Sequence, residues 1–186
     1  MSLAKPVTII AEAGVNHNGD LKKAYGLVDV AVDAGADIVK FQLFSADKLV
    51  QKDTPMAAYQ AENVTSISSQ YELLKSLELD HAAFHKIRAY CTRKQIELMV
   101  TPFDEDSVQF LANDLKVNAI KVSSGDLNNA PLLVAIAQTG LPCIISSGMA
   151  SMDEVQQALG VLAFGYFSSE TAPATAAFAL AFCAYH

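Results

Sequence analysis

Basic side chains are scarce in this sequence of 186 residues. Lysine and arginine together number 13 against 20 aspartate and glutamate residues, so the formal net charge at pH 7 is −7. This acidic balance argues against a nucleic acid or an anionic membrane as partner, because neutralising phosphates needs clustered lysine and arginine. Charged residues make up only 18% of the chain and hydrophobic residues 52%. That composition excludes a disordered chain and supplies a sizeable core for one domain.

Cysteine is also scarce, and the sequence lacks a long apolar run. Cys91, Cys143 and Cys183 are odd in number, and no pair has the Cys-x-x-Cys spacing of a disulfide framework or zinc ribbon. We therefore expect a protein of the reducing cytoplasm. The N-terminal residues contain no apolar stretch like that of a signal peptide. The apolar segment 172–185 is shorter than the roughly 20 residues that a membrane span needs.

Short apolar runs alternate with amphipathic helical stretches five times along the chain. Strands are predicted at 7–11, 37–43, 96–100, 119–122 and 143–145. Such alternation predicts an α/β fold with a parallel sheet. Local signals support the helices between the strands: Asp20 is a plausible N-cap, and Ser151 with Glu154 forms a capping box. From Gly165 onward the pattern predicts a loop and one more helix.

Two architectures fit this alternation, a doubly wound open sheet and a (β/α)8 barrel. The loop after the first strand, residues 12–17, lacks the glycine spacing of a dinucleotide site. Polar residues instead follow every predicted strand, which favours a barrel, where the active site collects residues from many strand ends. A complete barrel needs about 250 residues. We therefore expect a (β/α)8 TIM-type barrel that is truncated after about five βα units.

The polar residues at the strand ends would converge on one mouth of such a barrel. They are Glu12, Lys40, Gln42, Thr101, Lys121, Ser123, Ser124, Asp126, Ser146 and Ser147. Lys40 and Gln42 are two residues apart and share one side of their strand, whereas Phe41 points to the helices. Two lysines and several hydroxyls suit an anion that carries phosphate and carboxylate groups. Two acids among them suit sugar hydroxyls or proton transfer.

Less specific readings of these residues remain open. Lys40 or Lys121 could form a buried ion pair with Glu12 or Asp126, or act as the Schiff-base lysine of an aldolase. Thr101 and Ser146 could cap the helices that follow them. His17 is expected to order its loop through a hydrogen bond. His81 and His85 share one helical turn without a nearby third ligand, so we expect a solvated helix face.

Five segments of the sequence resemble the sialic acid synthase family in order and spacing. They are IAEAGVNHNG at 10–19, GADIVKFQ at 35–42, TPFD at 101–104, KVSSGDLNN at 121–129 and ISSGM at 145–149. The resemblance covers residues from about 7 to 166. It implies a (β/α)8 barrel followed by a small antifreeze-like domain. It also implies condensation of phosphoenolpyruvate with N-acetylmannosamine or a related hexose, giving a nine-carbon 2-keto sugar acid and phosphate.

The resemblance also implies roles for individual residues. Phosphoenolpyruvate would be held by a set of five, Lys40, Thr101, Lys121, Ser124 and Ser146. Gln42 would lie between the two substrates, and Glu12 and Asp126 would hold sugar hydroxyls and could transfer protons. Asp126 stands where some members carry glutamate. A divalent metal, Mn²⁺ or Mg²⁺, would polarise the sugar aldehyde, and family members are cytoplasmic homodimers.

Parts of the family pattern are missing from residues 1–186. The sixth strand, the strands with two metal-ligating histidines and the antifreeze-like domain are absent, and 165–186 resembles a helical insertion of some members. We therefore expect a partial barrel without turnover of its own, no metal ligand among these residues, and open edges at the first and fifth strands. The alternatives are a Schiff-base aldolase on the same barrel and a non-catalytic half-barrel module.

Overall fold

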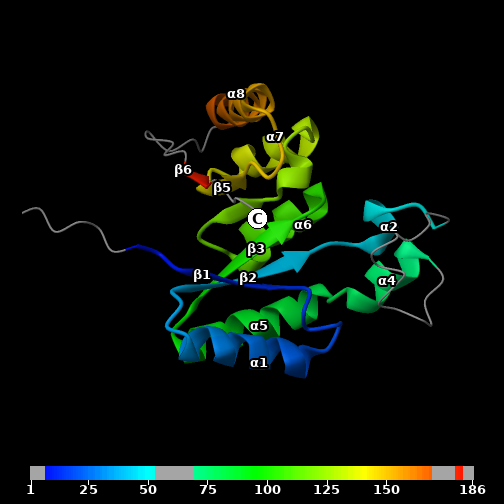
Figure 1. Cartoon of the computed structure of the whole chain (residues 1–186), viewed down its shortest axis with the longest axis vertical. Coiled ribbons are helices and arrows are strands. Elements are labelled where there is room, and N and C mark those ends of the chain that lie inside the picture. Colours follow the sequence, from blue (N-terminus) through cyan, green and yellow to red (C-terminus); the bar gives the residue numbers. More distant parts are fainter. Residues whose placement is uncertain (1–6, 53–68, 169–178, 182–186) are drawn as a thin grey trace, which may run out of the picture.

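The computed structural model describes residues 7–52, 69–168 and 179–181, and within them the strands form one parallel sheet. The strands are β1 (Ile10–Gly14), β2 (Ile38–Leu43), β3 (Glu97–Pro102), β4 (Ile120–Val122), β5 (Cys143–Ser146) and β6 (Ala179–Ala181). They pair in sequence order from β1 to β6. A doubly wound sheet reverses its strand order at a switch point, so this unreversed order excludes that alternative. The sheet is a curled part of a barrel (Figure 1), and closure by eight units stays a prediction.

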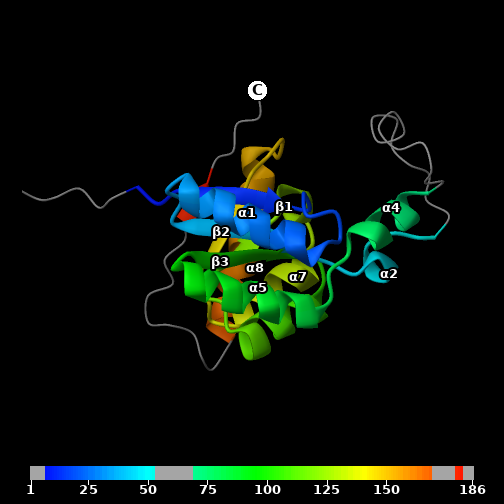
Figure 2. The same ribbon diagram turned by 90° about the horizontal axis from the view of Figure 1, so that it is seen from below.

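Helices follow the strands as the alternation predicted. The α-helices are α1 (Leu21–Asp33), α2 (Ala46–Leu49), α4 (Gln70–Leu77), α5 (His81–Lys94), α6 (Glu105–Gln109), α7 (Ala130–Gln138) and α8 (Met152–Ser168). A π-helix, η1 (Phe110–Leu115), continues α6, and a 3₁₀ turn, η2 (Ser124–Asp126), follows β4. In Figure 1, α1 and α5 lie along one flank of the sheet and α7 and α8 along the other. Figure 2 shows α2 and α4 standing apart from this body.

Local capping explains where several helices begin. Asp20 accepts a hydrogen bond from the Lys22 N–H at 2.7 Å, which confirms it as the N-cap of α1. Ser151 and Glu154 bond reciprocally before α8, side chain to backbone in both directions, which confirms the capping box. These bonds satisfy N–H groups that have no partner within the helix.

The core lies between the sheet and the helices around it. Phe41 on β2 is fully buried, whereas its neighbours Lys40 and Gln42 are partly exposed and face the other side of the strand. This confirms the predicted alternation. The large side chains of the core come from strands and helices alike: Phe41, Leu98 and Ile120 from the sheet, and Phe84, Ile87, Leu133 and Leu162 from the helices.

The prediction for the C-terminal tail was wrong in two respects. Helix α8 continues through Gly165 to Ser168, because Gly165 allows close packing on Ala137 of α7 rather than ending the helix. Residues 179–181 form β6, which pairs in parallel with β5, so β5 is an inner strand and not an open edge. Apolar runs of this length fit helix and strand equally well, and here the free edge of β5 offers backbone partners. The remainder of the tail lies outside the described residues.

Two cysteines of the described part are free and buried, Cys91 and Cys143. Burial raises the pKa of the Cys91 thiol to about 11, which makes the side chain a packing group. Cys183 lies outside the described residues. Among the residues that the structure describes, no helix is long and apolar enough to cross a membrane.

Two glycines of α8 provide a matched test of the packing between α7 and α8. A Cβ added to Gly165 would lie 2.6 Å from the Ala137 Cβ, whereas one added to the exposed Gly160 would meet nothing within 4 Å. We expect Gly160→Ala to raise the free energy of unfolding by about 0.5–1 kcal/mol through helix propensity. Gly165→Ala should lower it by about 1–3 kcal/mol through overpacking. Urea unfolding measures both, and an equal effect of the two substitutions would contradict the close helix contact.

Candidate functional site

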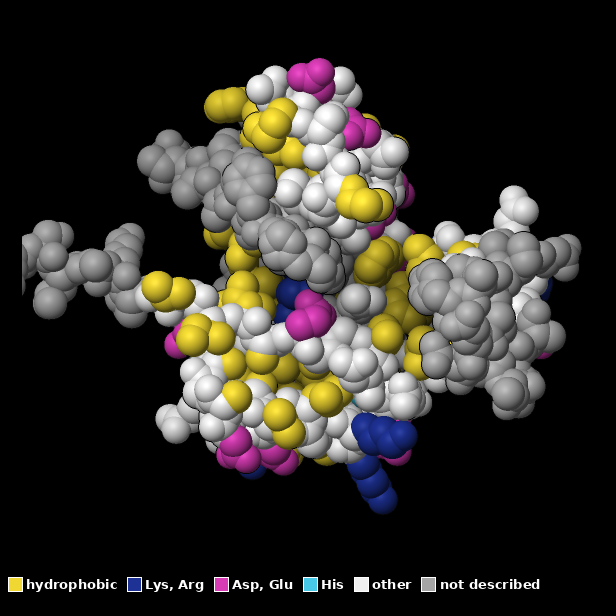
Figure 3. Space-filling view, viewed as in Figure 1, with side chains coloured by type: hydrophobic (Ala, Val, Ile, Leu, Met, Phe, Trp, Pro, Cys, Tyr) yellow, Lys and Arg dark blue, Asp and Glu magenta, His cyan; other side chains and the backbone are white. Residues whose placement is uncertain are grey.

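A cavity of about 350 Å³ lies at the carboxyl ends of β1 to β5. It is lined by Glu12, Gly14, Val15, Asn16, Lys40, Gln42, Thr101, Phe103, Lys121, Ser123, Ser124, Ser146 and Gly148. Of the eight site residues that the sequence predicts, these include all but Asp126. Acidic and basic side chains lie against each other near the centre of the face drawn in Figure 3, with hydrophobic side chains around them. The strand ends therefore bring the predicted polar residues together.

Lys40 and Glu12 form an ion pair across β1 and β2 within this cavity. Their Cα atoms are direct partners in the parallel pairing, so both side chains leave the same face of the sheet. The Lys40 side chain is 13% exposed and the Glu12 side chain 51% exposed. A bulge between Glu12 and Gly14 shifts the register after this pair. The ion pair with Glu12 that the sequence left open for Lys40 is thus present, but it is only partly buried, and both residues line the cavity.

Gln42 and Thr101 lie one pleat further along the sheet than this ion pair. They are direct partners between β2 and β3. Thr101 is 3% exposed and Gln42 half-buried. Asp104, which comes three residues after Thr101, caps α6 by accepting from the Ser107 N–H at 3.0 Å. Thr101 is therefore not the capping residue of that helix, and it lines the cavity.

Lys121 on β4 lies on the opposite wall and bonds to oxygen atoms of β4 and β5. Its Nζ donates to Ser146 Oγ at 2.6 Å and to the Val122 carbonyl at 2.7 Å. Ser146 is 7% exposed and also donates to the Val122 carbonyl at 3.3 Å. These bonds hold the lysine against the strand ends, with its ammonium group at the cavity.

Asp126 is the predicted site residue that does not line this cavity. It ends the turn η2, and the Asn129 side-chain amide donates to its Oδ1 at 3.4 Å. Burial raises the pKa of the Asp126 carboxyl above its usual value. The turn after β4 places Ser123 and Ser124 at the cavity and carries Asp126 beyond it.

Several cavity residues were missed because only polar strand-end residues were collected from the sequence. Phe103 and Val15 line the cavity with apolar surface, and Gly14 and Gly148 line it with backbone. Gly148 has a φ of +53°, and a Cβ there would lie 2.6 Å from Ser124 Oγ. A glycine directly after two serines at a strand end is a signal that could have shown this close contact.

His17 stabilises the loop that places Asn16 at the cavity. Its side chain is 1% exposed, and its Nδ1 accepts from the Gly19 N–H at 3.0 Å, which confirms the predicted loop-ordering bond. Within the described residues, the buried Nε2 of His17 has no hydrogen-bond partner. The ring lies 6.1 Å from that of Phe41, and burial lowers the pKa of the imidazole. The neutral form is therefore favoured in the folded protein.

The part of the chain that the structure describes contains no cluster of three or more His, Cys, Asp or Glu residues suited to a metal ion. His81 and His85 are exposed and pack on one ring instead. The His81 ring stacks on Phe110 with 3.7 Å between ring centres, and His85 meets the same ring edge-on at 5.4 Å.

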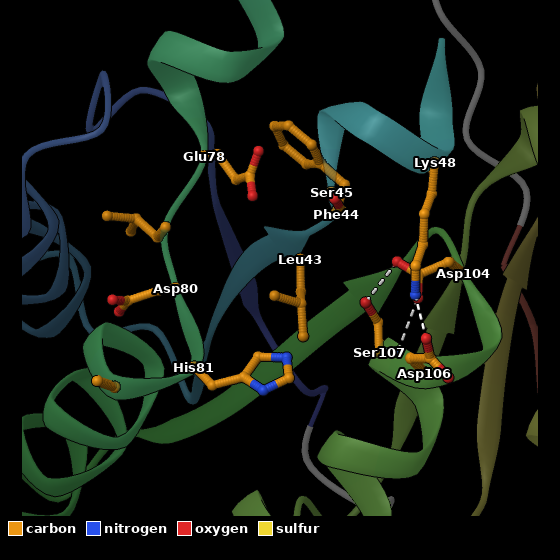
Figure 4. A pocket seen from close by; sticks show the side chains of 12 residues that line it. Leu43, Phe44, Ser45, Lys48, Glu78, Asp80, His81, Asp104, Asp106 and Ser107 are labelled. Atoms are coloured by element: carbon orange, nitrogen blue, oxygen red, sulfur yellow. Dashed lines mark hydrogen bonds and ion pairs between the residues drawn. The ribbon is translucent and has the colours of Figure 1, made fainter. Parts of the chain in front are cut away.

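A second and larger cavity of about 540 Å³ lies beside the first (Figure 4). Figure 4 shows Lys48 of α2 reaching towards Asp104 and Asp106, with which it forms ion pairs. Asp80 and Asp104 on its lining are helix caps, so these carboxylates already have structural partners. Its aromatic residue Phe44 meets Phe103 of the first cavity edge-on, with 6.3 Å between ring centres. The smaller cavity, with two lysines and several hydroxyls, is the stronger candidate for a ligand site.

Comparison with known proteins identifies relatives over most of the chain. A family model described as the NeuB family matches residues 27–184. N,N'-diacetyllegionaminic acid synthase of Legionella pneumophila is 48% identical over 81% of this chain and 42% of its own length. The Campylobacter jejuni enzyme of the same name is 41% identical over 85% of this chain and 47% of its own length. The chain therefore spans less than half the length of these two relatives.

A solved structure shows the same fold. The N-acetylneuraminic acid (sialic acid) synthetase of Leptospira borgpetersenii, in complex with citrate, aligns with a TM-score of 0.77 at 31% identity. The alignment covers 96% of this chain and 54% of that one.

Gly148→Ala tests whether the backbone after β5 shapes the cavity. The control is Gly35→Ala, because Gly35 also has a positive φ, of +72°, but a Cβ there meets nothing within 4 Å. Both substitutions should cost about 1–2 kcal/mol of stability through the left-handed backbone. Only Gly148→Ala should weaken binding of inorganic phosphate, by about tenfold, because it displaces Ser124. Titration calorimetry measures this, and equal phosphate affinity in the two variants would contradict the role of Gly148.

Burial of His17 predicts a pH-dependent stability. Its pKa is lowered in the folded state from 6.5, so below about pH 6.5 the unfolded chain binds a proton that the folded chain does not. The free energy of unfolding should therefore fall as the pH drops from 7 to 5.5, by up to about 1.4 kcal/mol per pH unit from this residue. His17→Gln should remove that component, and the exposed His85→Gln should keep it. Urea unfolding at several pH values measures the slopes; identical slopes in both variants would count against this origin.

Proposed function

The chain belongs to the NeuB family, and from this premise we propose that it forms the phosphoenolpyruvate-binding part of a sugar acid synthase. The reaction is condensation of phosphoenolpyruvate with an N-acylated hexosamine, which gives a nine-carbon 2-keto sugar acid and phosphate. The names of the relatives support synthesis of acids of the legionaminic and sialic type.

The observation that carries this proposal is the convergence of two lysines from different strands on one cavity lined with hydroxyls. Lys40 and Lys121 come from β2 and β4, and Thr101, Ser124 and Ser146 line the same space. Ammonium groups and hydroxyls are donors, so they suit a ligand that carries a phosphate and a carboxylate. We assign these five residues to phosphoenolpyruvate.

The chemistry needs these donors throughout the reaction. The C3 carbon of phosphoenolpyruvate attacks the sugar aldehyde, water adds at C2, and phosphate leaves by cleavage of the C–O bond. Negative charge remains on the carboxylate and collects on the departing phosphate, where Lys40 and Lys121 would stabilise it electrostatically. The family resemblance implies that Gln42 lies between the two substrates, and Gln42 lines the same cavity as Lys40.

The two acids, Glu12 and Asp126, are the groups that would accept hydrogen bonds from the sugar or take up a proton. Glu12 lines the cavity beside Lys40 and would accept hydrogen bonds from sugar hydroxyls. Asp126 ends the turn η2, whose first residue lines the cavity, and burial raises the pKa of its carboxyl, which suits a group that takes up and returns a proton. We propose that it acts on the second substrate rather than on phosphoenolpyruvate.

Other parts of the proposal rest on residues beyond those described. The chain spans 42–47% of the length of its two relatives. We propose that the whole enzyme also has the remaining barrel strands and the antifreeze-like domain, and that it forms the homodimer of the family. Among the described residues, no group of three or more His, Cys, Asp or Glu residues could hold a metal ion. A divalent metal would take its ligands from elsewhere, and no step is assigned to it. The chain alone should lack turnover, and we place the enzyme in the cytoplasm.

Titration calorimetry with phosphoenolpyruvate tests the proposed site. The chain should bind phosphoenolpyruvate, and Lys121→Met should weaken binding by at least about tenfold, because a donor to the anion is lost. Lys22→Ala is the control, since Lys22 is an exposed lysine on α1 outside the cavity, and it should bind like the parent.

Absence of binding by the parent chain would contradict the proposed site. Treatment with pyruvate and borohydride separates the competing aldolase: a covalent adduct on Lys40 or Lys121 would favour the Schiff-base enzyme. Full binding by Lys121→Met would remove that residue from the site.

A further inference from the structure

The ammonium group of Lys40 is already held by a carboxylate of the chain itself. Glu12 and Lys40 are direct partners across β1 and β2, and their side chains form an ion pair inside the 350 Å³ cavity. The Lys40 side chain is only 13% exposed, and a mostly covered ammonium group is costly without a partner. Glu12 therefore supplies the negative charge that Lys40 needs when no ligand is bound.

We propose that Glu12 is an internal competing anion, whose carboxylate occupies the anion position at Lys40 and must be displaced by a phosphate or carboxylate group of the ligand. This inference rests on the proposed function only in that the same cavity binds an anion. It adds that the chain limits the affinity of that site through one of its own side chains.

The difference in exposure of the two partners identifies the group that moves. Lys40 lies in an inner strand between β1 and β3 and is mostly covered, whereas half of the Glu12 side chain is exposed. Rotation of Glu12 towards solvent exposes a carboxylate to water, which costs little. Movement of Lys40 is more restricted, because its side chain is only 13% exposed.

The neighbouring backbone leaves room for the Glu12 carboxylate. A Cβ added to Gly14 would lie 3.3 Å from Glu12 Oε1 and 3.8 Å from Gln42 Nε2. Gly14 has a φ of +54° and directly follows the register shift between β1 and β2. A glycine after a bulge thus keeps open the space in which the carboxylate lies and through which it can turn.

Glu12→Gln tests this inference, with inorganic phosphate as the probe in titration calorimetry. The amide keeps the size of the side chain and removes its charge, so Lys40 is available to phosphate without displacing an anion. Phosphate affinity should rise by about threefold or more, the factor that corresponds to loss of a partly exposed ion pair. Asp106→Asn is the matched control. It also removes one carboxylate from a lysine, but at Lys48 on the second cavity, and it should leave phosphate affinity unchanged.

A double-variant cycle with Lys40→Met assigns the gain to the ion pair. With methionine at position 40, Glu12→Gln should give no increase, because there is no ammonium group to release. Equal or weaker phosphate binding by Glu12→Gln would overturn the inference, as would an increase of the same size in the Lys40→Met background. If the parent binds phosphoenolpyruvate but Glu12→Gln does not tighten phosphate binding, only this inference fails. If neither anion binds to any of the variants, the proposed site fails with it.

Discussion

Parallel pairing of β2 with β1 and β3 determines which side chains share the cavity. Partners in a parallel pair leave the sheet on the same side, so the register places Glu12 beside Lys40 and Gln42 beside Thr101. The same register turns Phe41 to the helices, where it is fully buried. A shift of one residue in β2 would bury Lys40 and Gln42 among the helices and expose Phe41. The register of β2 therefore determines both which side chains line the cavity and which side chain is buried in the core.

The cavity concentrates polar groups that a core would otherwise exclude. Thr101 and Ser146 are nearly buried, and Lys40 and Lys121 lie close to them with ion-pair or hydrogen-bond partners from neighbouring strands. Each partner reduces the cost of removing these groups from water. The same partners limit how strongly the lysines can attract an outside anion. Stability of the empty site and affinity for a ligand therefore depend on the same contacts.

Local signals in the sequence were sufficient for the first five strands, for several helix starts and for most of the site. Asp20 and the pair Ser151 and Glu154 cap their helices as predicted, because capping involves only residues three or four apart. Lys40, Thr101 and Lys121 reach one cavity because each side chain leaves the same face of the sheet near the carboxyl ends of neighbouring parallel strands. The sequential order of the strands was also predicted, because polar residues after every predicted strand favoured a barrel.

Contacts between distant segments decided the rest. Gly165 was read as the end of a helix, but it lies against Ala137 of another helix. Segment 179–181 forms a strand by pairing in parallel with β5, a partner more than thirty residues away in the sequence.

The sequence by itself therefore determined the parallel α/β fold, the family and the residue types at the strand ends. Only the tertiary structure decided that Glu12 is the partner of Lys40, that Gly148 lies against Ser124 and that Asp126 stays beyond the cavity lining. The physical reason is the distance along the sequence over which each interaction acts. Periodicity and capping act within a few residues, whereas an ion pair across strands 28 residues apart depends on the register of the folded sheet.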